Sequence, residues 1–345
     1  MTKIRSPFSK ASCTGGLFIL SMLFVISSGS LSYGQDFQDF SVLEFKSGAM
    51  IKMAGKGEWS SPDLSKPYPT GSSAKTSSAG PMKLQFDPQN IFRLLPGAEV
   101  IVKSPRDEGR FRRVTIDLKS GQVNLTLDNV PKNHVIEVQT PTAVCGAVGT
   151  TFSVNYSSKG SGLNQKFSCS RGQIFAKSSR DQSFQVNGIT AGKSVSAQVL
   201  PGKQNSANRL QLPSGVNVNL ANQSNSSYAF SSSGATVDVA KDINSTSQAL
   251  VVVRSGKVGD MGTGSYLLNG GNTSPVPAAK ASTASEYWNL ASQEGQLKAR
   301  IDSGEKGLEA QLGKIASAAS KKRQELFDRA LIRDTVRDSL PGGRR

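Results

Sequence analysis

The feature that most constrains this chain is a period of two in its apolar residues, interrupted at short intervals by glycine or proline. Between residues 40 and 177, Val123, Leu125 and Leu127 alternate with polar neighbours, as do Phe152 and Val154. Successive side chains of a strand point to opposite faces, so this pattern predicts strands. The frequent turn residues leave little room for a long helix. We therefore expect a mainly β fold.

A short turn-then-strand unit recurs along the chain. It occurs at residues 119–123 (KSGQV), 170–174 (SRGQI) and 254–258 (RSGKV), with a looser copy at 46–49 (KSGA). Each copy places a glycine at the turn before an apolar strand position. Such recurrence is compatible with the coils of a solenoid or the strands of a stacked sheet, although the spacing is irregular and simple hairpins also produce Ser-Gly turns.

The β pattern divides by composition into a stronger and a weaker part. Residues 40–180 carry the clear alternation and are expected to form one β-domain, whereas residues 181–268 hold short apolar runs in a background rich in serine and asparagine. We expect this second segment to be a β-rich extension, either continuous with the first or folded separately. Residues 269–282, rich in Gly, Pro, Ala and Ser, are predicted to be a linker.

Beyond the linker the period changes from two to 3.6. A Ser/Thr-x-x-Glu capping pattern at residues 283–286 precedes apolar residues at helical spacing, among them Leu290, Leu297, Ile301 and Leu312. We expect an amphipathic helical tail over residues 283–340. Gly304, Gly307 and Gly313 each weaken its central part.

The N-terminus has the layout of a signal peptide. Basic residues precede a short apolar stretch that ends in small residues near Gly34, and the stretch is shorter than a membrane span requires. We expect cleavage after residue 34, with an uncleaved anchor as the alternative. We also expect no later transmembrane segment and a periplasmic or secreted protein. Without residues 1–34 the chain keeps 38 basic and 25 acidic residues, a net charge of +13. This charge favours an anionic partner; the scattered basic residues and export argue against nucleic acid.

Cys145 and Cys169 are the cysteines that remain after such cleavage. An even pair in an oxidising compartment favours a disulfide, and a hairpin around residues 157–162 would bring the two together. Two buried free thiols are the main alternative. A reactive cysteine is less favoured because no histidine or Cys-x-x-Cys partner is nearby in sequence.

The sequence contains little reaction machinery. It has no phosphate-binding glycine motif, no nucleophile elbow and no His-Glu-x-x-His, and its single histidine, His134, follows turn residues at the start of a strand. Three cysteines and one histidine are too few for most metal sites. We expect neither an enzyme nor a bound cofactor or metal. Acid pairs for glycan cleavage remain open, because their separation in space is not visible in sequence.

Residues 140–154 carry the most specific pattern. Thr140-Pro141, then a small residue, then Gly149-Thr150 followed by Phe152 and Val154, resembles the signature of the FecR-like domain family. The resemblance extends over about residues 40–180, with further matches at Trp59, Gly121 and Gly172. Val148 stands where the family usually has Arg before Gly-Thr, which puts any contact of that Arg in doubt here.

The resemblance implies a stacked-sheet or solenoid-like β-domain that works outside the cytoplasm. Family members of the best-known type are periplasmic parts of transmembrane sensors that regulate sigma factors. This chain shows no internal transmembrane helix of that layout. We expect a non-enzymatic protein that binds an envelope protein or an anionic surface polymer. The alternatives are a signal-sensing component acting with a separate membrane partner and a glycan-active enzyme; the oligomeric state stays open.

Overall fold

The computed structural model describes residues 37–327 apart from 129, 148, 159–162, 180–182, 202–204, 221–227, 243–247, 270–271 and 303. The predicted signal peptide and Val148 lie outside the described residues. The strands are β1 Asp39–Phe45, β2 Met50–Lys52, β3 Pro67–Pro69, β4 Ser73–Lys75, β5 Met82–Asp87, β6 Asn90–Leu94, β7 Glu99–Val102, β8 Arg106–Glu108, β9 Phe111–Leu127, β10 His134–Gln139, β11 Ala143–Ala147, β12 Thr151–Ser157, β13 Leu163–Arg171, β14 Gln173–Ser178, β15 Phe184–Thr190, β16 Ser194–Pro201, β17 Asn205–Leu220, β18 Tyr228–Asp242, β19 Gln248–Val258, β20 Gly264–Asn269 and β21 Asn272–Pro275. The helices are the 3-10 helix η1 Ala278–Lys280, α1 Ala281–Asp302 and α2 Glu309–Phe327.

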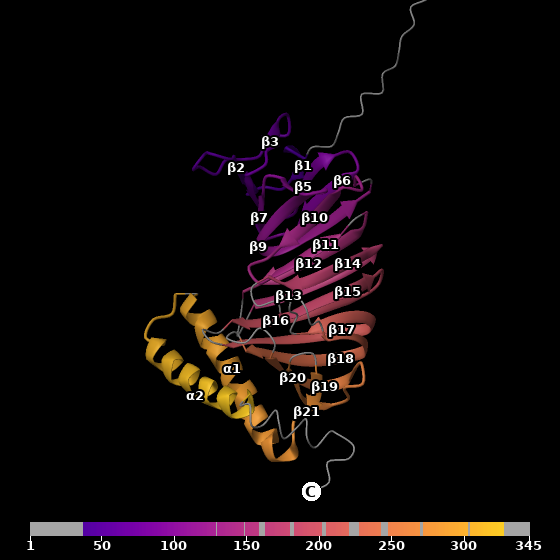
Figure 1. The fold of residues 1–345 in the computed structure, drawn as a ribbon. Coiled ribbons are helices and arrows are strands. Elements are labelled where there is room, and N and C mark those ends of the chain that lie inside the picture. Colours follow the sequence, from indigo (N-terminus) through magenta and orange to yellow (C-terminus); the bar gives the residue numbers. More distant parts are fainter. Residues whose placement is uncertain are drawn as a thin grey trace, which may run out of the picture. The chain divides into compact units, whose positions relative to one another are not determined.

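These strands form one hydrogen-bonded sheet that divides, by register, into two ladders. Ladder 1 runs through β3, β1, β5, β6, the second half of β9, β12, β13, β16, β17, β18, β19, β20 and β21. Ladder 2 runs through β2, β4, β7, the first half of β9, β10, β11, β14, β15 and the second half of β17. Figure 1 shows strands β9 to β18 following one another in this stack.

Glycines mark the places where the chain passes from one ladder to the other. The bends lie at Gly121 in β9, Gly172 between β13 and β14, and Gly215, Gly234 and Gly256 in β17, β18 and β19, all with positive φ. Three of these are the turn-then-strand units seen in the sequence. At Gly256 a Cβ would lie 1.7 Å from the carbonyl oxygen of Gly234. Glycine is therefore required there for close approach as well as for backbone conformation.

The core lies between the two ladders. Val123 and Leu125 from ladder 1 and Val114 and Ile116 from ladder 2 belong to one buried cluster, which extends from Phe37 to Leu268. Inward side chains alternate with outward ones along each strand, as the period of two requires. The predicted fold class, mainly β and followed by a helical region, is confirmed.

The helical region differs in detail from the prediction. α1 begins at Ala281, two residues before the Ser/Thr-x-x-Glu pattern, and is preceded by η1. The helix ends at Asp302, and Gly304 and Gly307 in the connection to α2 have positive φ. Glycine therefore interrupts the predicted continuous tail. The segment expected to be a linker contains β21 and η1.

Candidate binding site

The outward face of ladder 1 carries two rows of polar side chains. Each row runs across the strands and consists of residues that are directly opposite one another on neighbouring strands. The row that we call the lysine row contains Gln122, Asn155, Lys166, Ser196 and Gln211. The row that we call the arginine row contains Ser157, Asn164, Gln198, Arg209 and Asp238. Neighbouring strands lie about 4.8 Å apart, so each row repeats a polar group at about that interval.

A third row on the same face is apolar and is covered by the helices. Ala207, Ala240, Leu250 and Leu267 are opposite one another in β17 to β20. They pack with residues of α1 and α2, namely Ala284, Tyr287, Trp288, Ala291 and Leu326, in a second buried cluster. α1 also contacts β16 and β17, and Figure 1 shows both helices beside the lower strands. The helices thus cover the apolar row, and the groove described next lies over strands of the same ladder.

A groove of about 420 Å³ lies over the two polar rows. It is lined by residues of β12, β13, β16 and β17: Asn155, Asn164, Gln165, Lys166, Ser196, Ala197, Gln198, Arg209 and Gln211. Amide side chains both donate and accept hydrogen bonds, and Lys166 and Arg209 add positive charge. The lining includes no carboxylate. The groove is therefore suited to a ligand with hydroxyl or acidic groups.

A buried carboxylate organises the arginine row. Asp238 is fully buried, and its two oxygens accept hydrogen bonds from Nε and Nη2 of Arg209 at 2.7 and 3.1 Å. Nε of Arg254 also donates to Asp238. The hydrogen bond to Asp238 raises the pKa of Arg209. Because a buried carboxylate needs such partners, Asp238 holds both guanidinium groups in place.

The outward face of ladder 2 has a different character. A groove of about 470 Å³ is lined by Gln139, Val144, Lys177, Ser178, Ser179, Phe184 and Gln185. Nearby, Arg113 pairs with both Glu108 and Glu137, and hydrogen bonding to Glu108 raises its pKa. The Arg113 guanidinium is thus already engaged by two carboxylates, and the groove on ladder 2 includes apolar Val144. We therefore favour the face of ladder 1 as the binding surface.

The residues singled out in the FecR-like signature occupy structural positions outside the groove on ladder 1. Oγ1 of Thr140 donates to Oε1 of Gln165 at 2.5 Å, and Nε2 of Gln165 donates to Thr142 at 2.7 Å. This buried network ties the turn at Thr140-Pro141, between β10 and β11, to β13. Phe152 and Val154 are buried in the core.

Gly149 and Thr150 lie directly before β12. Gly149 has positive φ, but a Cβ there would meet no atom within 4 Å, so conformation and not close approach explains the glycine. The Thr150 hydroxyl is buried and has no hydrogen-bond partner in the described part of the chain. The Thr150 carbonyl instead accepts from the backbone N–H of Leu127 at 2.9 Å.

Cys145 and Cys169 are both buried free thiols in the structure, which contains no disulfide between them. They are not in one hairpin: Cys145 lies in β11 of ladder 2, whereas Cys169 lies in β13 of ladder 1, opposite Phe152. Burial raises the pKa of both thiols. The hairpin expected to join them is formed by β12 and β13, so the predicted geometry for the pair is wrong.

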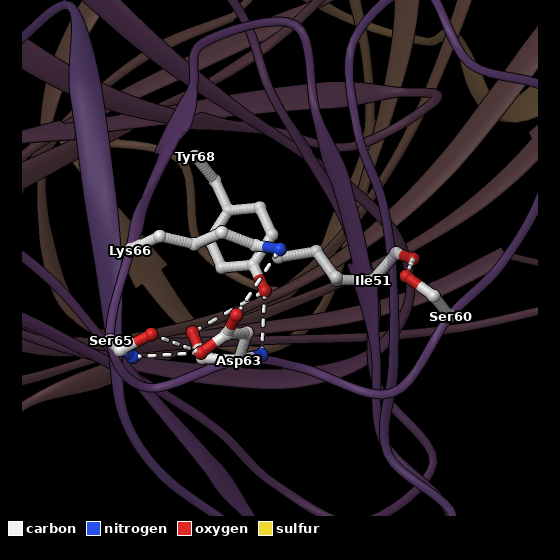
Figure 2. A network of polar contacts seen from close by, with 6 residues as sticks. All are labelled: Ile51, Ser60, Asp63, Ser65, Lys66 and Tyr68. Atoms are coloured by element: carbon white, nitrogen blue, oxygen red, sulfur yellow. Dashed lines mark hydrogen bonds and ion pairs between the residues drawn. The ribbon is translucent and has the colours of Figure 1, made fainter.

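Trp59 lies in a polar loop between β2 and β3, away from the groove. The Nζ atoms of Lys52 and Lys75 lie 5.3 and 4.3 Å from its ring centroid, within cation–π range. In the same loop the Asp63 carboxylate accepts from the backbone and hydroxyl of Ser65 and pairs with Lys66, as Figure 2 shows. The Asp63 N–H donates to the hydroxyl of Tyr68 at 2.6 Å. These contacts order the loop.

Sequence reasoning did not single out the groove residues. Asn155, Lys166, Gln198 and Arg209 occur at the polar positions of alternating strands, which is the one signal that marks them as outward. Two other kinds of site are absent from the described residues. No group of His, Cys, Asp or Glu there could hold a metal, and no described helix is long and apolar enough to cross a membrane.

The comparison with known protein families supports the resemblance. The sequence model for the FecR protein family matches residues 72–164, from β4 into β13. Two crystal structures of a candidate anti-sigma factor from Parabacteroides distasonis are similar at 13% identity, with a TM-score of 0.26, over 36% of this chain. The similarity spans 58% of those chains, which is less than two thirds of their length. No curated protein matches the chain.

Proposed function

We propose that this protein is a non-enzymatic binding protein of the cell exterior that holds a linear surface polymer along the two polar rows of ladder 1. The single observation that carries the proposal is the register of these rows. Amide, hydroxyl and cationic groups repeat across β12, β13, β16 and β17 at one constant interval and line an open groove. A chain of repeating polar units lying along the rows meets a similar set of groups at each strand.

The chemistry of the groove favours binding over cleavage. Glycan hydrolysis needs two carboxyl groups on either side of the scissile bond. The groove lining supplies amide groups, the Ser196 hydroxyl and the cations of Lys166 and Arg209, and it includes no carboxyl group. The signal-like N-terminus and the net positive charge support a negatively charged partner outside the cytoplasm.

Calorimetric titration of the purified protein with polygalacturonate, hyaluronate and neutral dextran tests the proposal. We expect binding to the acidic polymers. Changing both Asn164 and Gln198 to Ala should lower the affinity about 30-fold, since each change removes a hydrogen-bonding group worth about 1 kcal/mol. The matched control changes Asn187 and Asn217, which are opposite each other on ladder 2. Equal effects of the two double variants, or no binding to any polymer, would overturn the proposal.

A second candidate function is signal sensing together with a membrane partner, and the FecR match over residues 72–164 favours it. In this case the partner is an envelope protein. Crosslinking of the intact protein in an envelope fraction would yield one defined membrane protein. Recovery of no such protein would remove this candidate.

A further inference from the structure

We propose that Arg209, which lines the groove, and Arg254, which shares the Asp238 carboxylate with it, form an anion-recognition point at the end of the arginine row. Lys166 forms a second point two strands away from Arg209. The ligand is then an acidic polysaccharide that presents two acidic groups at this spacing. This inference rests on the proposed function, because it concerns the same outward face of ladder 1 and names the class of polymer that binds there.

The arginine pair is a built site. Asp238 is fully buried, whereas the Arg209 and Arg254 side chains keep 39% and 43% of their surface exposed. Asp238 uses Nε and Nη2 of Arg209 and Nε of Arg254. A guanidinium has five N–H donors, so both arginines retain donors for a carboxylate, sulfate or phosphate group. The cluster of two cations and one anion keeps a net positive charge.

Lys166 supplies the second point. It is exposed, lies in β13 and lines the same groove as Arg209 of β17. β16 lies between these strands, so Lys166 and Arg209 are two strand spacings apart, about 10 Å along the stack. Arg254 lies in β19, two strands further on beyond β18. Because both arginines donate to the Asp238 carboxylate of β18, which lies between them, they act as a single point.

Asp238 has a testable consequence for affinity. The charge of Asp238 cancels one of the two guanidinium charges. Asp238→Asn removes this opposing charge and keeps the side-chain shape and one acceptor oxygen, while its amide nitrogen accepts no hydrogen bond. The variant is expected to bind an acidic ligand about 3-fold more tightly, whereas Arg254→Gln is expected to bind it about 5-fold less tightly, within the range for exposed charge pairs. Misfolding would lower the affinity, so a gain in affinity for Asp238→Asn cannot result from it.

The experiment is calorimetry of the full chain with hyaluronate oligosaccharides that carry one, two or three carboxylates. We expect affinity to rise from one to two carboxylates and then to level off, and Lys166→Gln to abolish the rise. Lys257→Gln, an exposed lysine of β19 beyond the bend at Gly256, is the matched control and should change nothing.

Sulfated oligosaccharides and oligo-glutamate peptides of equal charge separate the possible ligands. Comparable binding of sulfated chains supports recognition of acidic groups in general. Tighter binding of the peptides overturns the assignment to a polysaccharide. If polymers bind but Arg254→Gln, Asp238→Asn and Lys166→Gln behave like the control, this inference fails and the proposed function stands. If the unaltered protein binds no polymer, both fail.

Discussion

At the scale of single residues, the bend glycines decide whether the strands can stack. Gly256→Ala places a Cβ 1.7 Å from the Gly234 carbonyl oxygen at a residue with φ of +74°. We expect a loss of about 3 kcal/mol in the free energy of unfolding, from overpacking and left-handed strain together. Gly192→Ala is the control, because its φ is +80° but the space around it is open. It should cost only about 1 kcal/mol. Equal losses in urea unfolding would refute the role of close approach.

Asp63 gives a residue-scale prediction about pH. Hydrogen bonds from the Ser65 side chain and backbone, together with Lys66, lower the pKa of Asp63 from 3.8 to about 2. A lowered folded-state pKa means that the contribution to stability is present above pH 3.8 and is lost as the pH falls through about 2. Fluorescence of Trp59, in the same loop, should therefore change over this range. Asp63→Asn should remove the transition; a transition that persists in this variant would assign it to another group.

At the scale of elements, buried aromatic side chains dock α1 on the sheet. Trp288 is 5% exposed and packs with Tyr287, Ala240 and Leu250. Trp288→Ala should weaken the docking by about 3 kcal/mol, because it leaves a cavity under the helix. Hydrogen exchange should then become faster in α1 and stay unchanged in β12. Gln293→Ala, at an exposed position of α1, is the control. Equal acceleration in β12 would show that helices and strands unfold together.

The same elements show how far the sequence could predict the fold and the site. Alternation identified the strands, and the recurring Ser-Gly and Arg-Gly turns identified three of the bends, because both signals are local. Pairing between distant strands is not local. The sequence therefore could not place Cys145 and Cys169 on different ladders, nor bring Asn155, Lys166 and Arg209 into one groove. The sequence also could not distinguish the apolar outward row, which α1 covers, from the lysine and arginine rows. The docking of the helices on the sheet determines which row is covered.

At the scale of the whole molecule, the question is whether the FecR-like part folds alone. The division at residue 180 predicted from composition falls between strands that share one core: β13 pairs with β16, and β14 with β15. A chain ending at residue 180 loses both partners and leaves two strand edges unpaired. Unpaired edges invite association between chains. We expect residues 35–180 to oligomerise in analytical ultracentrifugation, under conditions in which residues 35–345 give one discrete species. If the fragment is instead monomeric and unfolds cooperatively in urea, residues 40–180 are an independent domain. The core shared with the later strands is then an interface between two domains.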